Sequence, residues 1–312
     1  MSLPPYRSAR FYHDGLVWGC TPHGLASSVV RRSVVALITA LVALTGCAVL
    51  TRSATSGFAD DLYRAIVDQD DLQTVRDGAP AYLLAVDGLI QGASRDTSLL
   101  LAGARLYGAY ASAFVEDPAR AQRMWDRALR YARRALCLDL PQVCERASGP
   151  FDAFAESLQS VGSRDVDTLY GFAAAWAGWV QAHSDDWGAI AAVPKLQASM
   201  ERVVTLDDAH DDGGAHLYLG VLYSQRPAGL GGQPERGREH FERAVALSQG
   251  RNLMAKVYYA RQYARLVFDR PLHDRLLREV VGTDPATPGL TLSNTLAQEQ
   301  ARELLASADE FF

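Results

Sequence analysis

Lysine is almost missing from this 312-residue sequence, in which Lys195 and Lys256 are the two lysines among 31 basic residues. The 36 acidic residues give a formal net charge of −5, and no basic run or stripe of alternating basic and aromatic residues was found along the chain. Proteins that bind nucleic acids depend on such basic surface to neutralise phosphates. Nucleic acid is therefore not an expected partner.

Sequence motifs for catalysis are missing as well. The chain contains no Gly-x-Ser-x-Gly nucleophile elbow and no His-Glu-x-x-His zinc motif. Paired carboxylates such as Glu116-Asp117 and Asp185-Asp186 stand where helices are expected to begin, and carboxylates at such positions cap backbone N–H groups. We therefore expect neither enzyme activity nor a cofactor.

The stretch from Asp207 to His216 invites a metal site, since it holds four carboxylates and two histidines. Asp211 and Asp212 lie where the next helix must start, and acidic side chains are stabilised at a helix N-terminus. Capping explains these carboxylates without a metal, and we expect His216 to face a neighbouring helix. The sequence predicts no metal site.

The apolar run from Ser33 to Ala43 is too short to span a bilayer of about 30 Å. It follows the pair Arg31-Arg32, an arrangement that is typical of a secretion signal peptide. The run leads into Leu44-Thr45-Gly46-Cys47, which looks like a lipobox, so we expect cleavage before Cys47 and lipidation of this cysteine. The alternative is an uncleaved signal anchor, which would also export the domain.

These signals predict three parts of the chain. Residues 1–46 form an upstream segment and signal peptide, residues 47–57 form a lipid-anchored linker rich in Ser and Thr, and residues 58–312 form the folded domain. Three acyl chains would hold the protein on a membrane durably. The predicted location is the periplasm, and Ala48 after the cysteine favours the outer membrane.

Cysteine is scarce, and two of the four cysteines, Cys20 and Cys47, lie in the upstream segment or at the lipidation site. The remaining two, Cys137 and Cys144, are seven residues apart in a chain expected in an oxidising compartment. A local disulfide is the favoured interpretation, with two buried free thiols as the alternative. The stretch offers too few ligands for a metal.

Helical periodicity runs through the folded domain, and no alternating strand pattern competes with it. Apolar residues repeat at spacings of three and four from Ala121 to Leu136, and a similar stripe extends from Leu99 to Phe114. Asp117-Pro118 supplies an N-cap and a first helical residue between them. The two stripes predict an antiparallel helical hairpin.

The hairpin pattern recurs along the chain. Further helices are expected near residues 165–183, 186–206, 213–224, 234–248, 252–269, 271–282 and 293–310. The third pair resembles a tetratricopeptide repeat, because Gly220 lets its helices approach closely while Phe241 fills the adjacent space. The other pairs match loosely, so the expected fold is all-α, with irregular tetratricopeptide-like hairpins that form a compact solenoid or bundle.

Two connections interrupt this regularity. The glycine-rich segment 224–233 is longer than a standard repeat turn and is either a flexible spacer or a shaped loop at a pocket or partner surface. Segment 284–292 contains Pro285 and Pro288 and leads to a final helix.

Aromatic residues gather at helical spacing in two places. The first group is Tyr170, Phe172, Trp176 and Trp179, and the second is Tyr218, Tyr258, Tyr259 and Tyr263. Ordinary core packing is one interpretation. The other is a concave face on which these rings and the cation of Lys256 bind an amphipathic or acidic ligand.

An ordered set of segments resembles the T-component (TatT) family of tripartite ATP-independent periplasmic (TRAP) transporters. The segments are 82–90, 130–137, 215–222, 250–257 and 290–298, and they span nearly all of the folded domain. The resemblance implies a periplasmic lipoprotein that oligomerises, as a trimer, and docks the transporter's periplasmic solute-binding protein. It also implies a hydrophobic path for a ligand.

Positions that match the family are candidates for binding a ligand or a partner. They are Arg226, Pro227, Gly231 and Gly232 of the glycine-rich loop, together with Asn252, Lys256 and Asn294. The aromatic residues Trp176, Trp179, Tyr218 and Tyr259 join them as candidates. Two functions follow: a transport-associated binding subunit, or a structural lipoprotein scaffold for envelope or cell-wall assembly.

Overall fold

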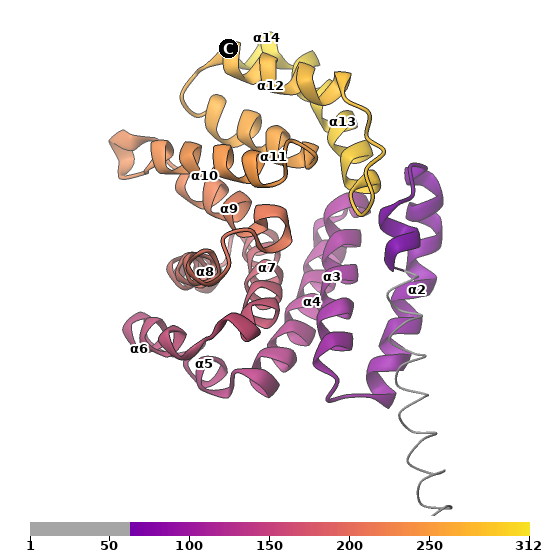
Figure 1. Cartoon of the computed structure of the whole chain (residues 1–312), viewed down its shortest axis with the longest axis vertical. Coiled ribbons are helices and arrows are strands. Elements are labelled where there is room, and N and C mark those ends of the chain that lie inside the picture. The colour runs from indigo at the N-terminus through magenta and orange to yellow at the C-terminus, as the bar shows by residue number, and fades with distance from the viewer. Residues whose placement is uncertain (1–62) are drawn as a thin grey trace, which may run out of the picture. The chain divides into compact units, whose positions relative to one another are not determined.

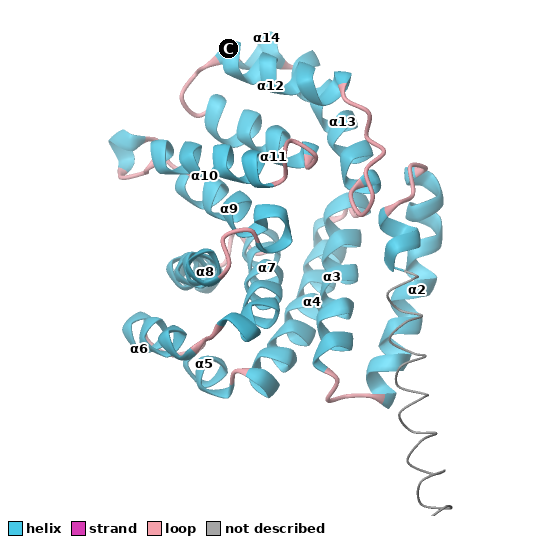
Figure 2. Cartoon of the chain, in the orientation of Figure 1, coloured by secondary structure: helices cyan, strands magenta, loops and turns pink. Residues whose placement is uncertain are grey.

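Residues 63–312 are described by a computed structural model, and they lie in one compact unit that begins at Phe58. This part of the chain consists of helices and their connections, without strands (Figures 1 and 2). The predicted all-α class is therefore confirmed. The α-helices are α2 (Leu72–Gly92), α3 (Thr97–Phe114), α4 (Pro118–Asp139), α5 (Pro141–Arg146), α6 (Phe151–Ser157), α7 (Val166–Ala182), α8 (Trp187–Leu206), α9 (His210–Tyr223), α10 (Pro234–Leu247), α11 (Leu253–Tyr258), α12 (Arg270–Gly282), α13 (Thr291–Ala306) and α14 (Ala308–Phe311).

The side chain of an aspartate caps the N-terminus of many of these helices. The side chain of Asp117 accepts a hydrogen bond from the Arg120 N–H at the start of α4, as the sequence predicts. Asp186 accepts one from the Gly188 N–H at the start of α8, and Asp71, Asp96 and Asp269 cap α2, α3 and α12 in the same way. These caps satisfy N–H groups that have no partner within the helix.

Helices α9 and α10 pack against each other through a small residue and a large one, as expected for a tetratricopeptide-like hairpin. A β-carbon on Gly220 would lie 2.8 Å from the Phe241 ring, and Phe241 is fully buried. The predicted packing of a small residue against a large one is therefore confirmed. In the first hairpin the small residue that packs against Trp125 is Gly108, whereas Gly103 packs against Ile90 and Tyr131.

Helix α2 was not among the helices expected from the sequence. It buries Val75, Ala79, Leu83, Val86 and Ile90 along one face, although Pro80 lies inside it. Its Asp87 carboxylate accepts hydrogen bonds from the Tyr107 hydroxyl (2.8 Å) and the Tyr131 hydroxyl (2.6 Å). Arg127 of α4 pairs with the same carboxylate. Asp87 thus ties α2 to α3 and α4.

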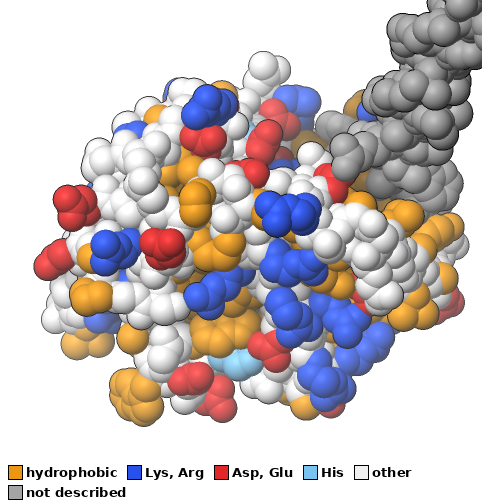
Figure 3. Space-filling model, turned by 90° about the horizontal axis from the view of Figure 1, so that it is seen from below, with side chains coloured by type: hydrophobic (Ala, Val, Ile, Leu, Met, Phe, Trp, Pro, Cys, Tyr) orange, Lys and Arg blue, Asp and Glu red, His pale blue; other side chains and the backbone are white. Residues whose placement is uncertain are grey.

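Arginines at a spacing of seven residues stack on tyrosines in this same region. The guanidinium groups of Arg120, Arg127 and Arg134 lie over the rings of Tyr110, Tyr107 and Tyr131, at 5.4–5.9 Å from the ring centroids. These pairs join residues that are not adjacent in the sequence, so the absence of a basic–aromatic stripe along the chain does not exclude them. Lys and Arg side chains also gather in a band on the face shown in Figure 3.

The disulfide between Cys137 and Cys144 joins the last turn of α4 to α5, with their α-carbons 5.0 Å apart. Cys137 is exposed and Cys144 is half-buried. The segment between the two cysteines is largely helical, because α4 runs to Asp139 and α5 begins at Pro141. The lipidation site Cys47 and the predicted signal peptide lie outside the described residues.

The C-terminal helices pack around a separate apolar cluster that includes Phe241, Leu253, Val257, Leu277 and Ala297. Helix α11 continues into a π-helical segment, Tyr259–Ala264, so the single helix expected near residues 252–269 changes its winding along its length. None of the helices formed by residues 63–312 is long and apolar enough to cross a membrane.

Candidate ligand-binding cavity

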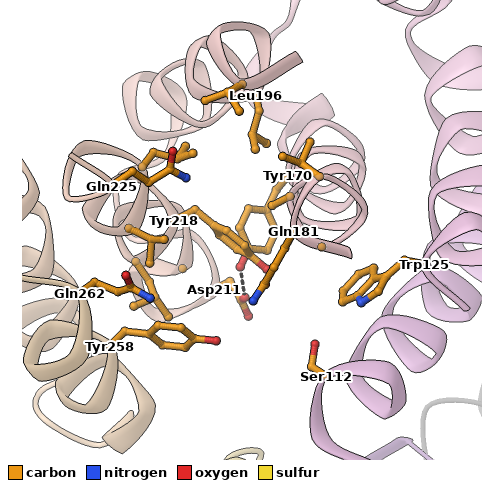
Figure 4. A pocket seen from close by; sticks show the side chains of 18 of the residues that line it. Ser112, Trp125, Tyr170, Gln181, Leu196, Asp211, Tyr218, Gln225, Tyr258 and Gln262 are labelled. Carbon is orange, nitrogen blue, oxygen red and sulfur yellow. Dashed lines mark hydrogen bonds between the residues drawn. The ribbon is translucent and has the colours of Figure 1, made fainter. Parts of the chain in front are cut away.

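A cavity of about 890 Å³ lies among α3, α4, α7, α8, α9 and α11, and Figure 4 shows many of its side chains. Its apolar lining comes from Trp125, Ala177, Val180, Ile190, Val193, Leu196, Leu217, Val221, Leu222 and Leu290. Its polar lining comes from Ser112, Tyr170, Gln181, Ser184, Asp211, Asp212, Tyr218, Gln225, Asn252, Tyr258 and Gln262. A largely apolar cavity with several polar groups is typical of a small-molecule site.

Trp125 forms part of the wall because two helices leave room for its ring. A β-carbon on Gly108 of α3 would lie 2.8 Å from the indole, and a β-carbon on Gly178 of α7 would overlap it. The indole is half-buried between these helices and lines the cavity. Figure 4 shows Trp125 and Ser112 on the α3–α4 side of the cavity, opposite Tyr258.

The carboxylate of Asp211 is a polar centre of the cavity. Its Oδ2 accepts a hydrogen bond from the Tyr170 hydroxyl at 2.6 Å, drawn in Figure 4. Burial, followed by the charge of Asp211, raises the pKa of Tyr170 well above its usual value. The phenol therefore stays protonated and donates to the carboxylate. Gly214 permits the contact, because a β-carbon there would overlap the Tyr170 hydroxyl.

The backbone of Asp211 and Asp212 is left-handed, with φ angles of 53° and 54°, and Gly213 follows at 83°. Such angles are unfavourable for residues other than glycine and are concentrated at functional sites. Neither carboxylate caps α9, which has no side-chain cap. Both aspartates lie in the first turn of α9, as expected, but neither makes the predicted cap, since the left-handed turn directs Asp211 toward Tyr170.

The second carboxylate, Asp212, is paired. It lies 3.0 Å from the guanidinium of Arg251, and both side chains are partly exposed. His216, by contrast, faces α10 as predicted, with its Nδ1 2.7 Å from the Nδ1 of His240 and its Nε2 2.7 Å from Asp208. No group of three or more His, Cys, Asp or Glu side chains suited to a metal occurs among residues 63–312.

Two of the site residues proposed from the sequence line this cavity, Tyr218 and Asn252. Burial raises the pKa of the Tyr218 phenol, and its ring packs edge-on against Tyr170 with centroids 6.2 Å apart. The Oδ1 atom of Asn252 is buried and has no hydrogen-bond partner among the described residues. A buried acceptor without a partner is costly unless a ligand or water satisfies it.

The other aromatic candidates lie elsewhere. Trp176 and Trp179 line a second cavity of about 540 Å³ beside α6 and α8, where Trp179 Nε1 donates to Asp126 at 2.9 Å. Tyr259 packs on Phe241 with centroids 5.3 Å apart, and its hydroxyl donates to Glu242. The structure therefore does not gather the aromatic candidates on one concave face.

Lys256 does not line the large cavity. Its Nζ lies 2.9 Å from Glu279 of α12, and its side chain is 14% exposed. The expectation of a lone cation that faces an acidic ligand was wrong, because a carboxylate on the next helix neutralises Lys256. Asn294 is fully buried and structural: it accepts from the Leu253 N–H and donates to the carbonyls of Arg251 and Pro285.

The glycine-rich loop folds back on itself. The Gly232 N–H donates to the Pro227 carbonyl at 3.1 Å, and a β-carbon on Gly232 would overlap the Arg226 carbonyl. Gly231 adopts a φ of 77°. Arg226, Pro227 and Gly231 are exposed and lie outside the lining of the cavity, to which the neighbouring Gln225 contributes.

Comparison with known proteins adds the decisive observation. Residues 68–312 match the model of the family described as TRAP transporter T-component. The chain belongs to this family. The T-component is also 28% identical over 277 residues to a protein of Treponema pallidum (strain Nichols) described as uncharacterized. That similarity covers 81% of this chain and 84% of the relative.

Membership of this family makes the protein a component associated with a TRAP transporter and places it in the cell envelope. The family is transport-associated and non-enzymatic. The cavity of the T-component contains residues that were not proposed from the sequence as ligand-binding, above all Asp211, Gln181 and Gln262. The acidic stretch drew attention to Asp211, but as a helix cap, and no sequence signal pointed to Gln181 or Gln262.

Proposed function

We propose that this T-component is a lipid-anchored periplasmic subunit that binds a small, partly apolar ligand in its large cavity and docks the solute-binding protein of a TRAP transporter. The observation that carries the proposal is the cavity of about 890 Å³, lined by aromatic, aliphatic and amide side chains, in a chain of this family. Cavities of roughly 300–1,000 Å³ with such linings hold small molecules.

The apolar wall supports a ligand with a hydrophobic body. Leu196 is almost fully buried, while Val193 and Leu222 are half-buried and leave part of their surface to the cavity. Covering apolar surface contributes about 25 cal/mol per Å². Gln181 and Gln225, which are exposed on the cavity wall, then select the orientation of the ligand, because a polar group that a ligand covers without hydrogen-bonding to it weakens binding.

Membrane attachment is proposed through Cys47. The sequence around this residue resembles a lipobox, and acylation there would hold the domain at the membrane surface, next to the transporter. A trimer and the docking of a solute-binding protein are proposed from the family resemblance. Lipidation is tested by the mass of the protein extracted from its native membrane: acyl chains on Cys47 support the anchor, and an unmodified cysteine contradicts it.

Native mass spectrometry of residues 48–312 tests the binding function, because this chain contains the whole compact unit that begins at Phe58. The expected result is a homo-oligomer that retains a small molecule and captures a TRAP solute-binding protein from the same organism. A protein that retains no small molecule and does not bind the solute-binding protein would contradict the proposal and favour a structural scaffold. A TRAP solute-binding protein from an unrelated operon serves as the control.

A further inference from the structure

The described lining of the large cavity contains negatively charged side chains and no positively charged ones. Its lining holds the carboxylates of Asp211 and Asp212, and none of the described residues that line it is Lys, Arg or His. Asp212 pairs with Arg251, which leaves Asp211 as the carboxylate that has no basic partner among the salt bridges of residues 63–312. The cavity therefore presents net negative charge to a ligand.

Cations near the cavity lie outside its lining. The charge of Arg105 on α3 acts to lower the pKa of Tyr170, but the Arg105 side chain is exposed. Arg261 lies over the ring of Tyr258, 4.6 Å from the centroid, and Arg251 is held by Asp212. Lys256, the cation expected from the sequence, is held by Glu279. Among residues 63–312, no basic group on the cavity wall is therefore available to bind a carboxylate.

The acceptor groups are placed to receive hydrogen bonds. Tyr170 uses one acceptor site on Asp211 Oδ2, whereas an ionised carboxylate has about four such sites. Asp211 is exposed to solvent and stays accessible to a ligand. The buried Oδ1 of Asn252 supplies a second acceptor without a partner. Both groups can therefore accept hydrogen bonds from donor groups of a ligand.

The aromatic lining suits the same kind of ligand. Tyr170, Tyr218 and Tyr258 face the space that contains Asp211 in Figure 4, and Trp125 closes its other side. Burial raises the pKa of Tyr170 and of Tyr218, so these rings stay neutral. Neutral aromatic faces attract cations.

We infer that the ligand of this cavity carries a protonated amine or a similar cationic donor on an apolar body, with the cation at Asp211, and that carboxylate ligands are disfavoured. The inference rests on the proposed function of the cavity as a ligand site. A cation about 4 Å from a partly hydrated carboxylate is attracted to it, and an anion is repelled. We expect a difference of roughly tenfold in affinity between an amine and its neutral analogue, which corresponds to about 1.4 kcal/mol.

Three probes with one body test the inference: 4-phenylbutylamine, 4-phenylbutanol and 4-phenylbutyrate, titrated by calorimetry into residues 48–312 at neutral pH and low salt. We expect the amine to bind about tenfold more tightly than the alcohol and the carboxylate to bind most weakly. Added salt should weaken the binding of the amine and leave the binding of the alcohol unchanged, because salt screens interactions between charges.

The variant Asp211→Asn removes the charge and keeps a side chain that tolerates the left-handed backbone. It should abolish the preference for the amine over the alcohol. Asp152→Asn on α6 is the control for the loss of one negative charge, because Asp152 is exposed and does not line the cavity, and it should keep the preference. If Asp211→Asn does not fold, the salt dependence of the unsubstituted protein decides instead.

The outcomes separate the inference from the proposed function. Equal or tighter binding of the carboxylate overturns the inference but leaves the cavity as a ligand site. An amine preference that persists in Asp211→Asn also overturns the inference, because the cation would then bind elsewhere. Failure of all three probes to bind contradicts the cavity as a ligand site and therefore both statements.

Discussion

Gly178 of α7 and Trp125 of α4 are in direct contact, since a β-carbon on Gly178 would overlap the indole ring. The absence of a side chain at Gly178 lets the indole lie between α7 and α3, where Gly108 receives its other side. Trp125 then lines the large cavity. The wall of the cavity therefore depends on this close approach between helices.

The variant Gly178→Ala should destabilise the protein by about 1–3 kcal/mol, because the added methyl group displaces Trp125 from a well-packed position. Gly78→Ala is the matched control. Gly78 also lies inside a helix, and a β-carbon there would meet no atom within 4 Å. Its replacement should stabilise α2 by about 0.5–1 kcal/mol. Denaturant unfolding measures both changes, and equal effects of the two variants would contradict the packing role of Gly178.

Substitution of Asn294 should mainly change the stability of the fold, and substitution of Asn252 should mainly change ligand binding. Asn294→Ala removes three hydrogen bonds from a fully buried side chain and should cost about 2–4 kcal/mol of unfolding free energy. Asn252→Ala should change stability by less than about 1 kcal/mol, since its Oδ1 has no partner to lose. The Asn252 variant should instead alter the binding of the probe amine. A stable Asn294→Ala protein with impaired binding would reverse these assignments.

His240 makes stability depend on pH. Burial lowers its pKa to about 4, and the nearby charges of His216 and Arg236 act in the same direction. Between about pH 6.5 and pH 4 the unfolded chain takes up a proton that folded His240 resists, so stability falls as the pH falls through this window. The loss should be about 1–2 kcal/mol, because His240 is half-buried and screened by solvent.

The measurement is the difference in unfolding free energy between about pH 7.5 and pH 5 for the unsubstituted protein and for His240→Gln. The variant should show a smaller difference, since it carries no titrating imidazole at this position. Histidines that do not contact His240 contribute equally to both proteins, whereas His216, whose Nδ1 lies 2.7 Å from that of His240, is coupled to it, so the difference reports this pair. An unchanged pH dependence in His240→Gln would show that a different group governs it.

Much of the fold could be predicted from periodicity and capping. Gly220 and Phe241 identified the α9–α10 hairpin because their contact lies within one repeat and appears as a local spacing. Helix α2 was missed, although Val75, Ala79 and Leu83 form an apolar stripe, since Pro80 interrupts the pattern. Its stability comes from contacts with distant residues, such as those of Asp87 with Tyr107 and Tyr131.

The candidate site was only partly predictable. Tyr218 and Asn252 were proposed and line the cavity, whereas Lys256 was proposed and is paired with Glu279, which lies 23 residues further along the chain. Asp211 was interpreted as a cap, because spacing does not reveal that two consecutive aspartates adopt a left-handed backbone. The charge of a site depends on which ionic groups pair, and this depends on packing between helices.

A cavity-blocking pair of variants on α8 tests the central claim most directly. Val193→Phe adds a ring to the large cavity, and Ala191→Phe, two residues earlier on the same helix, adds one to the second cavity. Binding of the neutral probe 4-phenylbutanol is measured by calorimetry for both variants and for the unsubstituted protein. The account predicts at least about tenfold weaker binding for Val193→Phe and unchanged binding for Ala191→Phe. Equal binding by all three proteins, or a loss confined to Ala191→Phe, would contradict it.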